Sequence, residues 1–343
     1  EIKLASIKRA NPHKALYDAF LNAIESDVYS KQTKSELTAS LFSYYIEGGS
    51  FFTFQKAFEQ HGSLLQYNSI IYRYWETISF EYDERFKAMF KGSEALFQES
   101  QESGDNQNVS DAYRLLARSK MHLNEKDSAL FYANLALNFA KRSDSRKAVA
   151  NTFKDLSEIE AYFDIIGKST STLLKLNKEA ERIKDYDLLC WSTMMIAERS
   201  FQVNSFNEAR TYYRKALNIA EKNGLELFKV RIYGGLAEIE LSNNQLDAAS
   251  LNIKKGYKYY NKQQESIFYL DFKLIHSKYL IEMDSLVEAE VILSDNLVEY
   301  AKLKSSIGLG KTHHLIGRIL FNEKKWKKAQ TSFNISKSIL DKF

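Results

Sequence analysis

The chain has 343 residues and a net charge of +4 spread along its length, which is too little and too dispersed to indicate nucleic acid binding. Its single cysteine, Cys190, excludes an intrachain disulfide and a cysteine-based zinc site. No run of about 18 apolar residues occurs, so we expect no segment that spans a membrane. One proline and 13 glycines leave few helix breakers, and long helices are predicted throughout.

The first 66 residues predict three helices, at 15–24, 36–46 and 51–60. Two interpretations of residues 1–66 are open: divergent helices that cap the rest of the chain, which we favour, or a small effector bundle. Residues 70–109 follow as a degenerate helical pair. Within them, the polar stretch 100–108 (SQESGDNQN) predicts a loop and the best candidate for a hinge.

From residue 110 onward, a spacing of 40 residues organises the chain. Small residues recur at Ala117, Ser157, Ala197, Ala237, Ser277 and Gly317, and again twelve positions later at Ala129, Ser169, Ala209, Ala249, Ala289 and Ala329. Three positions before the second series, large residues recur at Lys126, Ile166, Phe206, Leu246, Leu286 and Trp326, and we expect Trp326 to be packed like Phe206 and Leu246. Self-similarity of this kind is typical of a solenoid whose units bury their apolar faces by stacking.

Each 40-residue unit has the pattern of two helices joined by a turn. In residues 190–229, a first helix is predicted from Trp191 to Gln202, a turn at Asn204-Ser205 and a second helix from Asn207 to Asn223. The small residues would lie where two antiparallel helices cross, because helices approach closely only where side chains are short. We therefore predict a solenoid over 67–343, with repeats at 70–109, 110–149, 150–189, 190–229, 230–269, 270–309 and 310–343.

The small and aromatic positions of these units resemble the tetratricopeptide repeat family over residues 110–340. The matches are Leu116-Ala117 with Ala129 and Ala136, Ile196-Ala197 with Ala209, Tyr213 and Ala216, and Ile316-Gly317 with Ala329 and Phe333. The family's usual repeat of about 34 residues is shorter, and the proline that often ends each repeat is absent here. The resemblance implies an all-α, right-handed α-α superhelix, with the superhelical pitch left open.

Candidate catalytic motifs are weak. Residues 308–312 (GLGKT) match the end of a phosphate-binding loop, but Ser305 replaces the required earlier glycine, and the register places the segment at a turn between repeats. His313-His314 are adjacent, so they point to different helix faces and do not bind one metal ion together. The segment 324–328 (KKWKK) is interpreted as a solvated turn. We predict no catalytic residue, no metal site and no cofactor.

The resemblance also implies where a ligand would bind, because first helices line the concave surface in that family. The position after each small residue is always charged, with carboxylates in the centre: Arg118, Glu158, Glu198, Glu238, Lys278 and Arg318. One helical turn away, the predicted groove adds Arg114, Lys154, Tyr162 and Gln202. Our hypothesis is that the acidic centre receives a partner segment with Lys or Arg, while Tyr162 and Gln202 contact its backbone. The alternative is that these positions are solvated helix faces.

The expected function is a non-catalytic module that binds a protein or peptide, which under the hypothesis above is basic. We favour the sensory or regulatory region of a bacterial signalling or transcription-regulating protein, as the extracytoplasmic (periplasmic) part of a membrane-anchored chain. The alternatives are a cytoplasmic quorum-sensing peptide receptor with such repeats and a protein-assembly scaffold. We expect no contact with nucleic acid and no membrane insertion by this segment. A further expectation is that Phe333, Ile335 and Ile339 form an apolar surface at one end of the solenoid, which either a missing helix or a second copy in a homodimer would cover.

Overall fold

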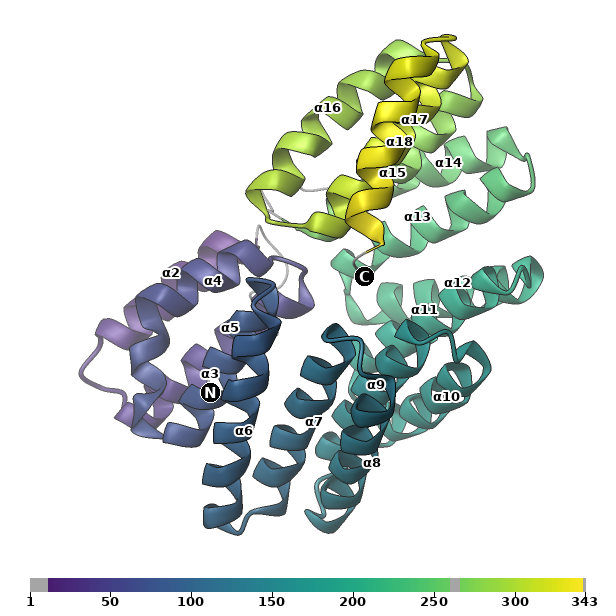
Figure 1. Cartoon of the computed structure of the whole chain (residues 1–343). Coiled ribbons are helices and arrows are strands. Elements are labelled where there is room, and N and C mark those ends of the chain that lie inside the picture. The colour runs from purple at the N-terminus through teal and green to yellow at the C-terminus, as the bar shows by residue number, and fades with distance from the viewer. Residues whose placement is uncertain (1–11, 260–265, 342–343) are drawn as a thin grey trace. The chain divides into compact units, whose positions relative to one another are not determined.

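A computed structural model describes residues 12–259 and 266–341, and within these ranges every regular element is a helix (Figure 1). The predicted all-α class is confirmed. The helices are α2 (Pro12–Glu25), α3 (Lys31–Glu47), α4 (Phe51–His61), the 3-10 helix η1 (Gly62–Tyr67), α5 (Ser69–Tyr82), α6 (Phe86–Ser103), α7 (Asn106–His122), α8 (Lys126–Arg142), α9 (Arg146–Tyr162), α10 (Ile166–Arg182), α11 (Tyr186–Gln202), α12 (Phe206–Asn223), α13 (Glu226–Ser242), α14 (Leu246–Tyr257), α15 (Ile267–Glu282), α16 (Leu286–Lys302), α17 (Ser306–Asn322) and α18 (Trp326–Leu340). None of these described helices is both long and apolar enough to cross a bilayer.

The helices end in a uniform way. A residue with positive φ follows α7, α9 and α11, at Asn124, Asp164 and Asn204. The next N–H donates back to a carbonyl in the last turn, as from Glu125 N to Lys120 O at 2.9 Å. This arrangement satisfies carbonyl groups that a helix end leaves without a partner, and it reverses the chain within three residues.

The first helices of the repeats start upstream of the repeat boundaries that the sequence predicts. The first helices of successive repeats begin at residues 106, 146, 186, 226 and 306, four residues before the expected repeat boundaries. Four of them begin at a capping side chain, at Asp105, Ser145, Asp185 and Ser305. Asp105 Oδ1, for example, accepts from Gln107 N at 2.7 Å. The predicted loop at 100–108 is wrong, because only Gly104 and Asp105 lie between α6 and α7.

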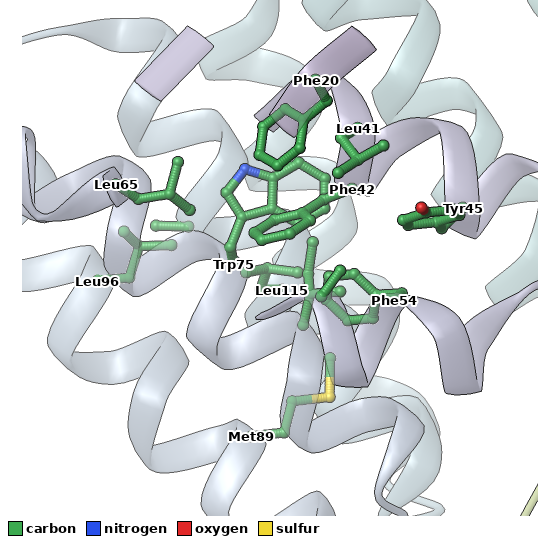
Figure 2. Close-up of a cluster of buried hydrophobic side chains, with 13 residues drawn as sticks. Phe20, Leu41, Phe42, Tyr45, Phe54, Leu65, Trp75, Met89, Leu96 and Leu115 are labelled. Carbon is green, nitrogen blue, oxygen red and sulfur yellow. The ribbon is translucent and has the colours of Figure 1, made fainter. Parts of the chain in front are cut away.

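Contacts divide the chain into two compact units. We call Glu1–Arg199 with Lys222–Gly224 the N-terminal unit, and Ser200–Glu221 with Leu225–Phe343 the C-terminal unit. In the N-terminal unit, α2, α3 and α4 share one hydrophobic cluster with α5, α6 and α7. Figure 2 shows Trp75 at its centre, where the ring packs on Phe42 and Phe54 with centroid distances of 5.5 and 5.9 Å. The predicted boundary at 66/67 falls in η1, beside this cluster.

The small residues lie at the helix crossings, as predicted. Every member of the two small series is buried in the structure. At the α9–α10 crossing, the Ser169 hydroxyl donates to the carbonyl of Ser157 at 2.7 Å. In the C-terminal unit, a Cβ added to Gly317 would lie 2.6 Å from the ring of Phe333. Short side chains at these points therefore allow the two helices of a repeat to approach each other.

Two expectations about the last repeat are wrong. Trp326 is 54% exposed, because it starts α18 at the rim and contacts the end of α17 through Phe321, with ring centroids 4.8 Å apart. Residues 308–312 do not form a turn but lie within the first two turns of α17, where Thr312 Oγ1 donates to Gly308 O at 2.8 Å. A helical backbone at this segment leaves no loop that could surround a phosphate.

Candidate functional site

The six charged positions that follow the small residues are all half-buried, on the first helices α7, α9, α11, α13, α15 and α17. Arg118, Glu158 and Glu198 belong to the N-terminal unit, and Glu238, Lys278 and Arg318 to the C-terminal unit. We use the term first-helix face of the N-terminal unit for Arg118, Lys154, Glu158, Tyr162 and Glu198. The partial burial of the charged members carries an electrostatic cost that neighbouring charges must offset.

Arg114, predicted to line the groove, is buried in an ion-pair network. Its Nε donates to Asp155 Oδ2 at 2.6 Å, and its Nη1 donates to Asp111 Oδ1 at 2.7 Å. Asp155 is 2% exposed. Burial raises the pKa of Asp111 although Arg114 opposes the rise. Arg114 thus ties α7 to α9 beneath the first-helix face.

Arg118 is half-buried and links α7 to α5 and α9. Its Nη2 lies 2.9 Å from Glu81 Oε1, and its Nη1 lies 3.4 Å from Asp155 Oδ1. His122 Nε2 also lies 2.8 Å from Glu81 Oε1. Burial disfavours the charged carboxylate, but Arg118 and His122 outweigh it and lower the pKa of Glu81 to about 2. The other oxygen of Glu81, Oε2, is buried and has no hydrogen-bond partner among the described residues.

Glu158 is the carboxylate on the first-helix face that has no ion pair with any described residue. Burial raises its pKa, and the charges of Asp155 and Glu81 act in the same direction, while Lys154 and Arg118 act against them. Burial and these two negative neighbours thus outweigh Lys154 and Arg118 at Glu158. A further cation would therefore lower the electrostatic energy of this face.

Two aromatic side chains lie near this part of α9. Lys154 Nζ lies 5.0 Å from the centroid of the Trp191 ring, which places α11 next to this part of α9. Tyr162, one turn after Glu158, contacts Phe163 edge-on with ring centroids 5.0 Å apart, and burial raises its pKa. A tyrosine in this setting keeps its hydroxyl proton and can donate a hydrogen bond.

In the C-terminal unit, the three predicted charged residues form ion pairs. Glu238 forms an ion pair with Lys278, and Arg318 Nη2 lies 2.6 Å from Glu282 Oε1. Gln202, also assigned to this unit, is exposed at the end of α11. The carboxylate of Glu238 is thus already neutralised, so Glu158 is the better candidate for binding a cation.

Several residues of the network were not predicted from the sequence. Asp155 lies three positions before Glu158, and Asp111 lies three positions before Arg114. Residues at this spacing are neighbours on a helix, so the spacing was the signal in the sequence that could have identified them. Glu81 lies in the degenerate repeat, where the 40-residue register aligns it with Met121 and gives no such signal. Among the described residues, no group of three or more His, Cys, Asp or Glu side chains is arranged to hold a metal ion.

Comparisons with known proteins identify the fold. No family model matches the sequence, and no curated protein matches it. A Rap protein solved in complex with competence and sporulation factor is 13% identical with a TM-score of 0.61, and the match covers 99% of this chain and 96% of the Rap chain. The apo quorum sensor NprR from B. thuringiensis is 13% identical with a TM-score of 0.59, over 98% of this chain and 95% of NprR.

A third similar structure contains repeats of a named type. A signal transduction ATPase with numerous domains (STAND) from Pyrococcus horikoshii, which has a tetratricopeptide repeat sensor, is 14% identical with a TM-score of 0.62. That match covers 99% of this chain and 54% of the archaeal one. The chain therefore has a tetratricopeptide-like fold of helical repeats.

Proposed function

We propose that the chain is a non-catalytic binding module of a signalling regulator, and that its ligand is a protein or peptide segment with a Lys or Arg side chain. The observation that carries the proposal is Glu158, a half-buried carboxylate on the first-helix face with no ion pair among the described residues. A cationic side chain there would offset a cost that the fold itself leaves uncompensated.

The neighbours of Glu158 suit a peptide. Lys154 is held against Trp191 and lies beside the carboxylate, so it favours ligands that bring only one or two positive charges. Tyr162 offers a hydroxyl group one turn further along α9. An extended segment has backbone carbonyls that accept such hydrogen bonds, and it loses affinity if its cation is removed.

The proposal is tested by selecting peptides from a random library displayed on phage against the full chain. We expect enrichment of Lys- or Arg-containing sequences. A synthetic copy of an enriched peptide should bind Glu158→Gln at least about tenfold more weakly, the change expected when a charged partner of a buried group is lost. Glu94→Gln, which removes an exposed carboxylate from α6, is the matched control and should bind as the wild type does. Enrichment without basic residues, or equal binding by Glu158→Gln, would refute the proposal.

A more specific candidate function is a quorum-sensing peptide receptor. It is supported by the likeness to the Rap protein and NprR, which extends over 98% or more of this chain and 95% or more of theirs. A receptor of this kind binds short linear peptides, so free synthetic peptides from the selection should bind as tightly as the same sequences fused to a carrier protein. Binding only within a folded carrier would instead support the sensory-module or scaffold alternative.

A further inference from the structure

Helix α16 in the C-terminal unit carries a stripe of exposed valines that its fold does not require. Val287, Val291 and Val298 are 76%, 61% and 67% exposed. Their spacing of four and seven residues places them on one side of the helix, with the exposed Ser294 between them. The stripe is about 16 Å long at the rise of an α-helix. Valine is a poor choice for an exposed helix position, because its branched side chain loses rotamer freedom there.

The repeats themselves provide the control for this observation. In α12, the residues at the equivalent positions are Asn207, Thr211 and Asn218, and in α18 they are Lys327, Thr331 and Ser338. All six of these polar residues are exposed. The second helix of a repeat therefore folds with polar residues at these positions, and packing within the chain does not explain three valines in α16.

Acidic residues border the valine stripe on both sides. They are Glu288, Glu290, Asp295 and Glu299, all on α16. Asp295 lies 4.0 Å from Lys273, and Glu299 lies 3.9 Å from Lys302. Glu288 and Glu290 are exposed and have no ion pair among the described residues. An apolar stripe with a negative border fits a partner that has the opposite pattern.

From this pattern we infer that α16 (Figure 1) docks a basic amphipathic helix of a partner protein, with the valine stripe covered by its apolar face and Glu288 and Glu290 paired with its Lys or Arg residues. Two copies of α16 placed face to face would bring these carboxylates against each other, which disfavours a second copy of the chain as the occupant. Anionic lipid or nucleic acid would be repelled in the same way. The inference does not depend on the peptide site at Glu158.

The test uses the full chain and a labelled synthetic peptide of about 18 residues, helical, with Leu on one face and Lys on both sides of it. Fluorescence anisotropy should show saturable binding that weakens with added salt. Val287→Asn with Val291→Thr and Val298→Asn gives α16 the residues of α12, which fold at these positions, and should reduce affinity at least about tenfold. Glu288→Lys with Glu290→Lys should reduce it similarly.

Two controls decide the specificity. Leu251→Thr changes the exposed residue that corresponds to Val291 on α14, and it should leave peptide affinity unchanged. A peptide with Glu in place of every Lys should not bind. Equal binding by the triple valine variant and the wild type, or equal binding of the acidic peptide, would overturn the inference. So would a dimer of the wild type in sedimentation velocity that becomes a monomer in the triple variant, since the occupant would then be a second copy.

Discussion

Among single side chains of the N-terminal unit, Asp155 connects two arginines of the charged network. It accepts from Arg114 and lies within ion-pair distance of Arg118, and it is almost fully buried between α7 and α9. Removal of this carboxylate takes one partner from both arginines at once, and a buried cation cannot replace the lost partner with water.

We therefore expect Asp155→Ala to lower the free energy of unfolding by about 3 kcal/mol, the usual cost of removing one partner from a buried ion pair. Urea denaturation followed by circular dichroism measures the change. The matched control is Glu282→Ala, which removes the partner of Arg318 from an exposed pair and should cost no more than about 1 kcal/mol. Equal losses in the two variants would show that the network at Asp155 contributes no more than a surface pair.

Glu158 gives a pH-dependent prediction. Its pKa is raised in the folded chain, so the folded state holds the proton at pH values where the unfolded chain has lost it. The contribution of Glu158 to stability is then neutral below its ordinary pKa and falls as pH rises through the raised pKa. Glu158→Gln cannot ionise, so we expect it to melt at a higher temperature than the wild type at pH 7.

That difference in melting temperature should shrink towards zero below about pH 4, where Glu158 is protonated in both states. Differential scanning calorimetry of the two proteins across this range measures it. Glu94→Gln again controls for the loss of one negative charge. A difference that stays constant with pH, or that favours the wild type at pH 7, would contradict the raised pKa.

Only part of the candidate site could be predicted at this scale. The register placed Arg118, Glu158 and Glu238 at one equivalent position of their helices, and all three are half-buried there, because a 40-residue period carries every side chain to the same place on its helix. It could not show that Arg114 would be buried by Asp155 and Asp111. Pairing depends on which charges from neighbouring helices come within about 4 Å, and a periodic pattern does not specify that distance.

Between helices, glycine positions differ sharply in what they tolerate. A Cβ added to Gly308 in α17 would lie 2.2 Å from the ring of Tyr300 in α16, which is fully buried and donates its hydroxyl to Asp271 at 2.8 Å. Gly167 in α10 has no atom within 4 Å of the same position. The two glycines thus separate the effect of close packing from the effect of helix propensity.

We expect Gly308→Ala to lower the stability of the folded state by about 1–3 kcal/mol, because Tyr300 has no room to move away. Gly167→Ala should raise it by up to about 1 kcal/mol, since alanine is the better helix former. Thermal unfolding of both variants, with the wild type alongside, measures the two signs. Stabilisation by Gly308→Ala would mean that α16 and α17 pack less closely than the structure describes.

For the elements as a whole, the sequence predicted the existence of the repeat helices and the burial of the small residues. It placed the repeat boundaries four residues after the starts of the first helices, because the capping residues Asp105 and Ser145 lie before the first apolar position. It also predicted burial for Trp326. At this position of the repeat, the large side chain packs on the end of the preceding helix. In the last repeat, the contact with Phe321 covers Trp326 only in part.

The whole chain consists of two units, and we expect them to unfold separately, because a repeat array is stabilised by neighbouring contacts rather than by one shared core. Trp75 and Trp191 lie in the N-terminal unit, whereas Trp326 in the other unit is already exposed. Tryptophan fluorescence therefore reports chiefly on the N-terminal unit. Circular dichroism reports on every helix.

The two signals should give different midpoints in a urea titration. A variant with Trp326→Phe keeps the same fluorescence transition if the assignment of the signal is correct. Superimposable transitions by both probes would indicate that the two units unfold as one cooperative body.

Residues with positive φ follow the helices at a regular interval along the chain. From Glu84 to Asn244, positive φ recurs at every twentieth residue, with Gly104 and Gly224 in the series, and it recurs again at Asp284, Lys304 and Lys324. One residue gained or lost inside a helix would rotate all later side chains by about 100° and move the apolar stripe off its neighbour. The array therefore tolerates many substitutions but few changes of length. It can grow or shrink by duplication or loss of whole helix pairs, which keeps the equivalent positions of all repeats in phase.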